Sequence, residues 1–387
     1  MSKKIEPICI FLCGDVMTGR GIDQVLPHPG NPVLYESYVR DARYYVEIGR
    51  EVSGPIPQPV DFNYIWGDAL KVLEQAGTDV RIINLETSIT TSNDYWPYKE
   101  ALYRMHPENI GCLTAAGIDC CCLANNHLLD WGYKGLTETI KTLNMAGVSH
   151  TGAGDNDTVA ASPAIFNIAG KGRVLVFSFG STSSGIPLKW AATRDRPGIN
   201  LLEDLSEDTV QHIVRWIGQF KQPGDVIVAS IHWGGNWGYY IPNEQINFAH
   251  RLVEEGVSIV HGHSSHHVRP IEVYQNRLIL YGCGDFITDY EGISGYEAFR
   301  DDLAIAYLAK VDPTNGELVE VKLVPMQVRQ FQLKAALTGD IEWLMNLLNR
   351  LGTPFGTQVK VENNNSLTLY WQQNHKQIGL SSSVTQI

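Results

Sequence analysis

The sequence lacks any long hydrophobic run. No apolar stretch reaches the roughly 20 residues that a membrane-spanning helix needs. The N-terminal residues MSKKIEPICIFLCGD contain a short apolar run but no small-residue cleavage site, so we expect a first strand there rather than a signal peptide. We therefore expect a protein without a membrane anchor.

Basic residues are also scarce. The chain has 30 Lys and Arg against 42 Asp and Glu, which gives a net charge of −12. Without a basic surplus the protein has little with which to neutralise phosphate groups. General binding to nucleic acid or to an anionic membrane is therefore not expected, although a local basic pocket is compatible with this composition.

Cysteines are few and odd in number. There are seven, and Cys120, Cys121 and Cys122 are contiguous in an apolar run. A disulfide framework is not expected from such a set, and reduced, buried thiols in the cytoplasm fit it better.

Short apolar runs alternate with segments of helical periodicity, which is typical of α/β proteins with a partly parallel sheet. Hairpins expected at 163–179 and 271–281 require antiparallel pairs as well. A sandwich of two sheets with helices on its outer faces satisfies both observations. The elements expected near the polar clusters are strands at Ile8–Cys13, Val80–Ile83 and Ile118–Ala124, and helices from Asp61 to Gly77 and over Asn243–Glu255.

No break in this pattern divides the chain before about residue 325. We expect one domain over 1–325, with an ordered insertion rich in proline and tyrosine at about 22–60 that forms a lid or a specificity element. Residues 326–387 are expected to form a C-terminal extension with a helix, a strand and a polar tail.

Polar side chains follow the predicted strands one after another. Because the carboxyl ends of parallel strands meet at one edge of a sheet, these groups are expected to lie together. Carboxylate, amide and imidazole groups bind zinc, manganese or iron, and they also serve as acids and bases. The residues are Asp15, Asn84, Glu86, Asn126, His127, His232, His263, His266 and Asp285.

Six ordered motifs carry these residues: GDVMTGR, NLETSIT, LANNHLLDWG, HWGGNW, GHSSHHVRPIE and YGCGDF. In order and position they resemble the CapA family of poly-γ-glutamate and capsule biosynthesis proteins, within the calcineurin-like metallophosphoesterase superfamily. The resemblance covers roughly residues 7 to 325. It implies a four-layer α/β/β/α sandwich of the metallophosphoesterase type with mixed central sheets.

The resemblance also implies roles. Asp15 resembles the carboxylate of the first motif, Glu86 the bridging carboxylate, and His127 the histidine near the reacting group, which would donate a proton. The implied catalytic residues are His127, Glu86, His232 and Asp15. The implied metal ligands are Asp15, Glu86, Asn126, His232, His263 and His266.

Three residues depart from the superfamily pattern. Met17 stands where phosphoesterases have a histidine, and a thioether is a poor ligand for a hard or borderline dication. Glu86 replaces the usual aspartate, and Asp285 stands where many family members have asparagine. The resemblance implies a site for divalent metal (Mn, Zn or Fe) with two metal positions, one of which lacks a ligand in this sequence.

Other residues are expected to surround the site. Asn84, Asp130 and Asp285 would support the ligands, and Arg20 and Arg194 would clamp an anionic substrate. Trp233, Asn236 and Trp237 would line the pocket. His261 is expected to point back into the sheet and His267 to lie at the mouth.

Three hypotheses of function follow. The first is a cytoplasmic CapA-like enzyme that performs metal-assisted hydrolysis of a peptide-like (γ-glutamyl or amide) or phosphoester substrate. The second, which relatives of this fold suggest, is a metal-independent epimerase of a residue in a ribosomally made peptide, with His127 or His232 opposed to Glu86. The third is a non-catalytic factor of capsule or polyglutamate synthesis.

Overall fold

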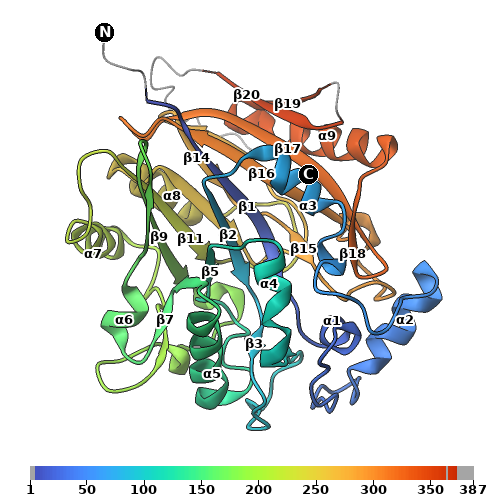
Figure 1. Cartoon of the computed structure of the whole chain (residues 1–387). Coiled ribbons are helices and arrows are strands. Elements are labelled where there is room, and N and C mark those ends of the chain that lie inside the picture. Colours follow the sequence, from blue (N-terminus) through green and yellow to red (C-terminus); the bar gives the residue numbers. More distant parts are fainter. Residues whose placement is uncertain (1–4, 363–364, 373–387) are drawn as a thin grey trace.

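Two stacked β-sheets form the centre of the computed structural model, which describes residues 5–362 and 365–372 (Figure 1). Ten of the described strands belong to the first sheet. In spatial order they are β19 (Thr357–Val361), β20 (Leu367–Trp371), β17 (Leu318–Arg329), β16 (Leu303–Val311), β1 (Ile8–Val16), β2 (Val80–Leu85), β5 (Cys120–Cys122) and β6 (Ser149–Thr151), with β15 (Asp285–Ile287) beside β1 and β18 (Gln332–Ala335) beside β17.

The second sheet and two short strand pairs complete the described β structure. The second sheet has the order β13 (Ile271–Tyr274), β14 (Arg277–Leu280), β12 (Ile259–His263), β11 (Asp225–His232), β9 (Gly172–Gly180) and β8 (Ala164–Ile168). The pairs are β10 (Gly198–Ile199) with β7 (Ala153–Gly154), and β3 (Ser88–Ile89) with β4 (Arg104–Met105).

Both sheets are mixed. The strands β1, β2, β5 and β6 run parallel to one another, as do β9, β11, β12 and β14. The strands β16, β17, β20 and β19 continue the first sheet in antiparallel order, and the hairpins β8–β9 and β13–β14 add antiparallel edges to the second. Both expected hairpins are therefore present.

Helices cover the outer faces of the two sheets (Figure 1). The described α-helices are α1 (Gly21–Val25), α2 (Arg43–Ser53), α3 (Ala69–Ala76), α4 (Gly111–Ala115), α5 (Gly132–Met145), α6 (Asp157–Ala161), α7 (Glu207–Ile217), α8 (Asn243–Glu254) and α9 (Thr338–Gly352). Ser206 caps α7, since its side chain accepts a hydrogen bond from the backbone N–H of Thr209.

The side-chain alternation of the central strands explains the layers. In β1, Ile10 and Leu12 pack between the sheets against Val176 and Val228 of the second sheet, whereas Phe11 packs on the opposite side beneath the helices. The outer face of the second sheet packs against α7 and α8. The predicted four-layer α/β/β/α sandwich is confirmed.

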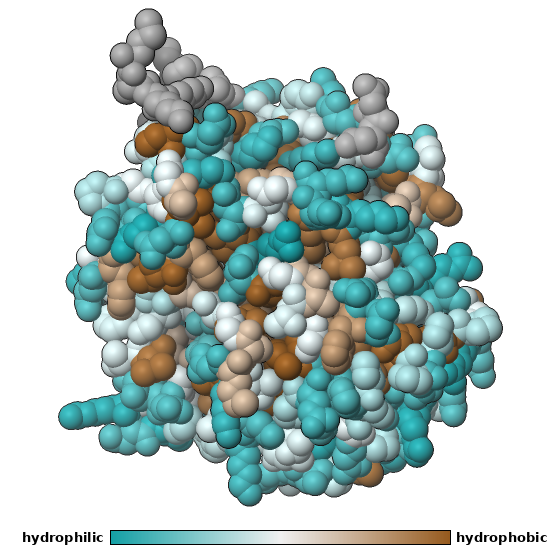
Figure 2. All heavy atoms as spheres, viewed as in Figure 1, coloured by the Kyte–Doolittle hydropathy of each residue, from teal (hydrophilic) through white to brown (hydrophobic). Residues whose placement is uncertain are grey.

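The surface has the opposite composition to these interior layers. In Figure 2 hydrophilic residues predominate on the face shown, and hydrophobic residues lie in small groups between them. Within the described residues, none of the helices combines the length and the apolar character that crossing a bilayer requires.

Several boundaries differ from the expected ones. The strand β1 continues to Val16, so Asp15 lies within it rather than after it. The helix expected from Asp61 begins only at Ala69. Gly67 adopts a φ of 45°, and a Cβ at this residue would collide with the carbonyl oxygen of Leu333 in β18. A side chain at residue 67 would not fit there.

The insertion and the C-terminal segment are both ordered in the described residues. The insertion at 22–60 contains α2, which packs beside α1 (Figure 1). The strand β17 runs through residue 325, and β18, β19 and β20 extend the same sheet. The division of the chain at residue 325 and the lid role of the insertion stay predictions, and the expected polar tail lies outside the described residues.

The layer between the sheets gives a test of the fold. Replacing the fully buried Ile82 of β2 by alanine leaves a cavity there, so we expect the free energy of unfolding in urea to fall by about 2–5 kcal/mol. As the matched control, Ile165→Ala on β8, where the side chain is 42% exposed, should cost less than about 1 kcal/mol. Equal losses for the two variants would contradict the assigned layers.

Candidate active site

Four central strands deliver polar side chains to one edge of the sandwich. Asp15 of β1 pairs in register with Asn84 of β2, and His232 of β11 pairs with His263 of β12. All four side chains are buried. Parallel pairing therefore brings together residues that lie far apart in the sequence, as the strand-end pattern predicts.

A second pairing brings Asp285 to the same place. The short strand β15 runs parallel to β1 with Asp15 opposite Asp285, and the Asp15 N–H donates to the carbonyl of Gly284. A Cβ at Gly14 would lie 1.7 Å from the oxygen of Gly284. Only glycine at position 14 allows this approach, so the two Gly-Asp pairs are what place the two carboxylates side by side.

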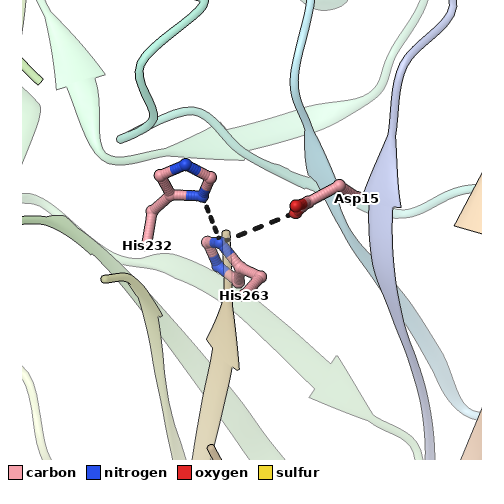
Figure 3. Close-up of side chains that lie close together, drawn as sticks. All are labelled: Asp15, His232 and His263. Carbon is pink, nitrogen blue, oxygen red and sulfur yellow. Dashed lines mark hydrogen bonds and ion pairs between the residues drawn. The ribbon is translucent and has the colours of Figure 1, made fainter. Parts of the chain in front are cut away.

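One group of candidate ligands contains two imidazoles and a carboxylate (Figure 3). Nδ1 of His232 lies 2.8 Å from Nδ1 of His263, which in turn lies 3.9 Å from Oδ1 of Asp15. Nε2 of His232 lies 2.9 Å from Oδ1 of Asn126. Two ring nitrogens that face each other need either a proton on one of them or a cation shared between their lone pairs.

A second group shares Asp15 with the first. Nδ1 of His266 lies 2.9 Å from Oδ1 of Asp285, and the ligand atoms of Asp15, His266 and Asp285 all lie within 4.8 Å of one another. Asp285 was expected only to support the site, and the structure instead places it among the candidate ligands. The side chain of Met17 offers neither a nitrogen nor an oxygen ligand to this group, and its backbone N–H donates a hydrogen bond to the carbonyl oxygen of Ile287.

Two buried carboxylate oxygens have no hydrogen-bond partner among the described residues. They are Oε2 of Glu86 and Oδ2 of Asp285, both on side chains that are about 1% exposed. An unpaired buried carboxylate oxygen is costly unless a cation compensates it. The oxygen and imidazole donors around them therefore fit a divalent metal.

The pKa values of these side chains reflect the close packing of the buried carboxyl groups. Burial, followed by repulsion from Asp285, raises the pKa of Asp15 to about 7. Burial and the nearby Asp15 raise the pKa of Glu86 well above its usual value. Although burial disfavours the imidazolium of His266, its contact with Asp285 outweighs that effect and raises the pKa of His266.

His127 is held in one orientation at the edge of this cluster. Its Nδ1 lies 2.7 Å from Oδ2 of Asp130, and its Nε2 lies 3.5 Å from Oε1 of Glu86. Lys99 donates to Oδ1 of Asp130 at 2.5 Å and to the backbone oxygen of Asn126. Burial lowers the pKa of His127 to about 4, so the ring is neutral near pH 7, with its proton on Nδ1 facing Asp130.

Arg20 is buried behind the site rather than open to a substrate. Its guanidinium pairs with Asp289 at 2.5 Å, donates to the hydroxyl of Tyr45 and lies 3.5 Å from Glu36. It also lies over the ring of Tyr103. These contacts occupy the charge of Arg20 in this structure, and its expected role as a clamp for an anionic substrate stays a prediction.

The remaining expected pocket residues separate into two groups. Trp237 lies beside His266, with 5.4 Å between ring centroids, and the backbone oxygen of the exposed Asn236 accepts the N–H of His266. Trp233 is fully buried in the core against α8 and does not line a pocket. Arg194 is exposed on a turn, and no hydrogen bond joins it to the site within the described residues.

Of the two histidines set apart in the sequence, one lies as expected. His261 is buried and its Nε2 lies 2.7 Å from the backbone oxygen of Cys13, so it points into the sandwich. His267, which was expected at the mouth of the site, is instead fully buried, and its ring stacks with Trp237 and Phe299.

Sequence reasoning missed several residues of the site. Lys99 lies in the segment between β3 and β4, and no motif marks it. Ser230 contacts Nε2 of His263 at 2.8 Å, and its position two residues before His232 on β11 was an available signal. Asn125, next to the predicted Asn126, donates to Oδ1 of Asn84 and accepts from the backbone of His127.

Comparison with known proteins assigns this arrangement to a family. The chain matches the family model described as "Bacterial capsule synthesis protein PGA_cap" over residues 9–290. The protein therefore belongs to this family of capsule synthesis proteins, and the resemblance read from the six motifs is confirmed.

Two curated relatives extend over most of the chain. It is 46% identical over 368 residues to the probable polyglutamine synthesis accessory protein of Mycobacterium tuberculosis, covering 95% of this chain and 97% of the relative. It is 24% identical over 333 residues to the capsule biosynthesis protein CapA of Bacillus anthracis, covering 85% of this chain and 69% of that one. Among solved structures, a phosphatase from Mycoplasma pneumoniae aligns with a TM-score of 0.48 and 12% identity, over 84% of this chain and 94% of that one.

The close approach of β1 and β15 leads to a prediction. Gly14→Ala must push the strands apart, so we expect it to lower the free energy of unfolding by about 1–3 kcal/mol and to reduce the bound metal measured by elemental analysis. Gly339→Ala is the control, because a Cβ at that position would meet nothing within 4 Å. Unchanged stability and metal content in Gly14→Ala would refute the proposed constraint.

The buried carboxyls predict an unusual pH dependence. A carboxyl whose folded pKa is raised stabilises the fold while it is protonated. For Asp15 this contribution is complete below its ordinary pKa of 3.8 and is lost as the pH rises through about 7. Glu86 and His266, whose pKa values are also raised, act in the same direction.

In the presence of a chelator, the stability that Asp15 contributes should therefore be lost between about pH 5 and pH 7, as measured by urea titration. Asp15→Asn serves as the reference, so the free energy of unfolding of the wild type relative to this variant should fall over that range, and added Mn²⁺ should stabilise the wild type at pH 7. A relative stability that rises over this range would show that Asp15 is not held as described.

Proposed function

We propose that this protein is a hydrolase that uses a divalent metal to cleave a peptide-like or phosphoester bond in capsule or polyglutamate synthesis. The observation that supports this most is the convergence of four imidazoles and three buried carboxylates at one edge of the sandwich, with two carboxylate oxygens unpaired. Such a donor set is costly to bury without a cation.

The chain's own residues supply the ligands. A bound Mn, Zn or Fe ion would polarise the scissile group and lower the pKa of a water molecule. The residues that would hold it are Asp15, Glu86, Asn126, His232, His263 and His266.

His127 would move the proton in this reaction. Its Nδ1 is fixed against Asp130, and its Nε2 points toward the cluster, where it lies near Oε1 of Glu86. A bound anionic substrate would raise the pKa of His127 from about 4, since a nearby negative charge favours the imidazolium. Nε2 would then donate its proton to the leaving group while Lys99 and Asp130 hold the ring in place.

The relatives' names guide the choice of substrate. One is called a polyglutamine synthesis accessory protein and another a capsule biosynthesis protein. We therefore favour a peptide-like substrate with γ-glutamyl or amide bonds over a simple phosphoester. The seven cysteines are free and buried, which supports the expectation of a reducing compartment such as the cytoplasm.

Epimerisation without a metal is the second candidate, and the loss of an imidazole at Met17 favours it. An epimerase needs its acid and base on opposite sides of a Cα. His127 and His232 lie only 3.5 Å and 3.9 Å from Oε1 of Glu86, which leaves no room for a carbon atom between them. This spacing is the reason that we favour hydrolysis.

Metal content and turnover test the proposal together. Purified protein should contain near-stoichiometric Mn, Zn or Fe by elemental analysis, and Glu86→Ala or His232→Ala should remove it. His127→Ala should keep the metal but lower kcat by about 100-fold on γ-linked glutamyl oligomers, because it removes only the proton donor. Glu74→Ala and His212→Ala, at exposed positions on α3 and α7, are matched controls.

Other outcomes would select a different function. Metal-free protein that is fully active would overturn the proposal, and deuterium uptake at a peptide Cα from heavy water would establish the epimerase instead. Metal-loaded protein that cleaves neither glutamyl oligomers nor a phosphoester such as p-nitrophenyl phosphate would favour the non-catalytic factor.

A further inference from the structure

We infer that Asp285 is a metal ligand, which completes a second, oxygen-rich metal position in place of the imidazole that Met17 does not supply. This inference rests on the proposed function, because it concerns the metal content of the same site. It adds a residue that the motif pattern does not assign as a ligand, and it distinguishes the two metal positions chemically.

The backbone places Asp285 for this role. Met17 directly follows β1, and the neighbouring strand β15 offers a carboxylate from beside β1. The absence of a Cβ at Gly14 lets the carbonyl oxygen of Gly284 approach β1 closely. Asp285 thereby faces Asp15 directly, and both share the second group with His266.

Only one of the two carboxylate oxygens of Asp285 is hydrogen-bonded among the described residues. Oδ1 contacts His266 at 2.9 Å, whereas Oδ2 is buried and has no hydrogen-bond partner among the described residues. A residue kept only to orient His266 would not need a second, unpaired oxygen in a site that already contains Asp15 and Glu86. A cation beside Oδ2 removes this cost.

The two groups differ in the atoms that they offer. Asp15 with His232 and His263, beside Asn126, provides two imidazole nitrogens and two oxygens, a set that suits zinc or iron. Asp15 with Asp285 and His266 provides mostly carboxylate oxygens, which suit manganese or magnesium. The carboxylate of Asp285 therefore makes the second position harder in chemical character than the first, which shifts its relative preference toward Mn²⁺.

Metal counting on the full-length protein tests this inference without relying on activity. Wild-type protein and variants are loaded with MnCl₂ or with ZnCl₂, dialysed, and analysed for bound equivalents, while free Mn²⁺ is followed by electron paramagnetic resonance. We expect two equivalents in the wild type and one in Asp285→Ala, with Mn²⁺ affinity at the lost position reduced by more than about 100-fold.

Two further variants separate ligation from general effects. Asp285→Asn keeps the shape of the side chain and one carbonyl oxygen, so it should fold and yet weaken Mn²⁺ binding by about 10-fold or more. Asp301→Asn is the matched control, since Asp301 acts on Asp285 and His266 through its charge but is not in the candidate ligand group. It should retain both equivalents.

The outcomes are distinct. Wild-type protein with no bound metal would overturn the proposed function itself. A wild type with two equivalents that Asp285→Ala and Asp285→Asn both retain would overturn the role of Asp285 alone, as would a wild type with a single equivalent. Loss of one equivalent in Asp301→Asn as well would show that charge, rather than ligation, is responsible.

Discussion

The contact between β1 and β15 is the constraint on which the rest of the site depends. Two Gly-Asp pairs face each other across parallel strands, and the absence of a side chain at Gly14 lets the backbone of Gly284 approach. This approach concentrates negative charge in a buried place. The imidazoles on β11 and β12 then complete a donor set whose burial cost is offset by protonation of the carboxyls or by a bound cation.

The protein's other cations are arranged so that they do not neutralise this cluster. Arg20, the arginine of the first motif, is paired with Asp289 and Glu36, and its guanidinium lies over tyrosine rings. Lys99 pairs with Asp130 at the edge of the site. Among the described residues, no arginine or lysine pairs with the carboxylates of Asp15 and Asp285, which is the electrostatic condition that a metal centre requires.

Much of the fold followed from the sequence alone. Alternating apolar runs and helical segments indicated two mixed sheets, and the order of six motifs indicated the family and the strand-end clustering of Asp15, Glu86 and His232. These features are encoded locally, because each polar group lies at or next to the carboxyl end of its own apolar strand.

The features that sequence reasoning missed depend on contacts between distant segments. Asp285 reaches Asp15 only through the register of β15 against β1, which no local pattern specifies. Lys99 comes from a segment without periodicity. Trp233 was expected at a pocket wall, but an aromatic residue after a strand can face the core as easily as the solvent, and the packing of α8 decides this.

The cluster around Arg20 has a consequence for which substitutions the insertion tolerates. Glu36 and Tyr45 of the insertion hold Arg20 from one side, and Tyr103 joins it to the ring of His127. Tyr44, on the same helix as Tyr45, is exposed, and among the described residues no contact joins its side chain to Arg20. The insertion therefore has a buried root and an exposed outer face, so that substitutions on the outer face need not disturb the reacting groups beneath.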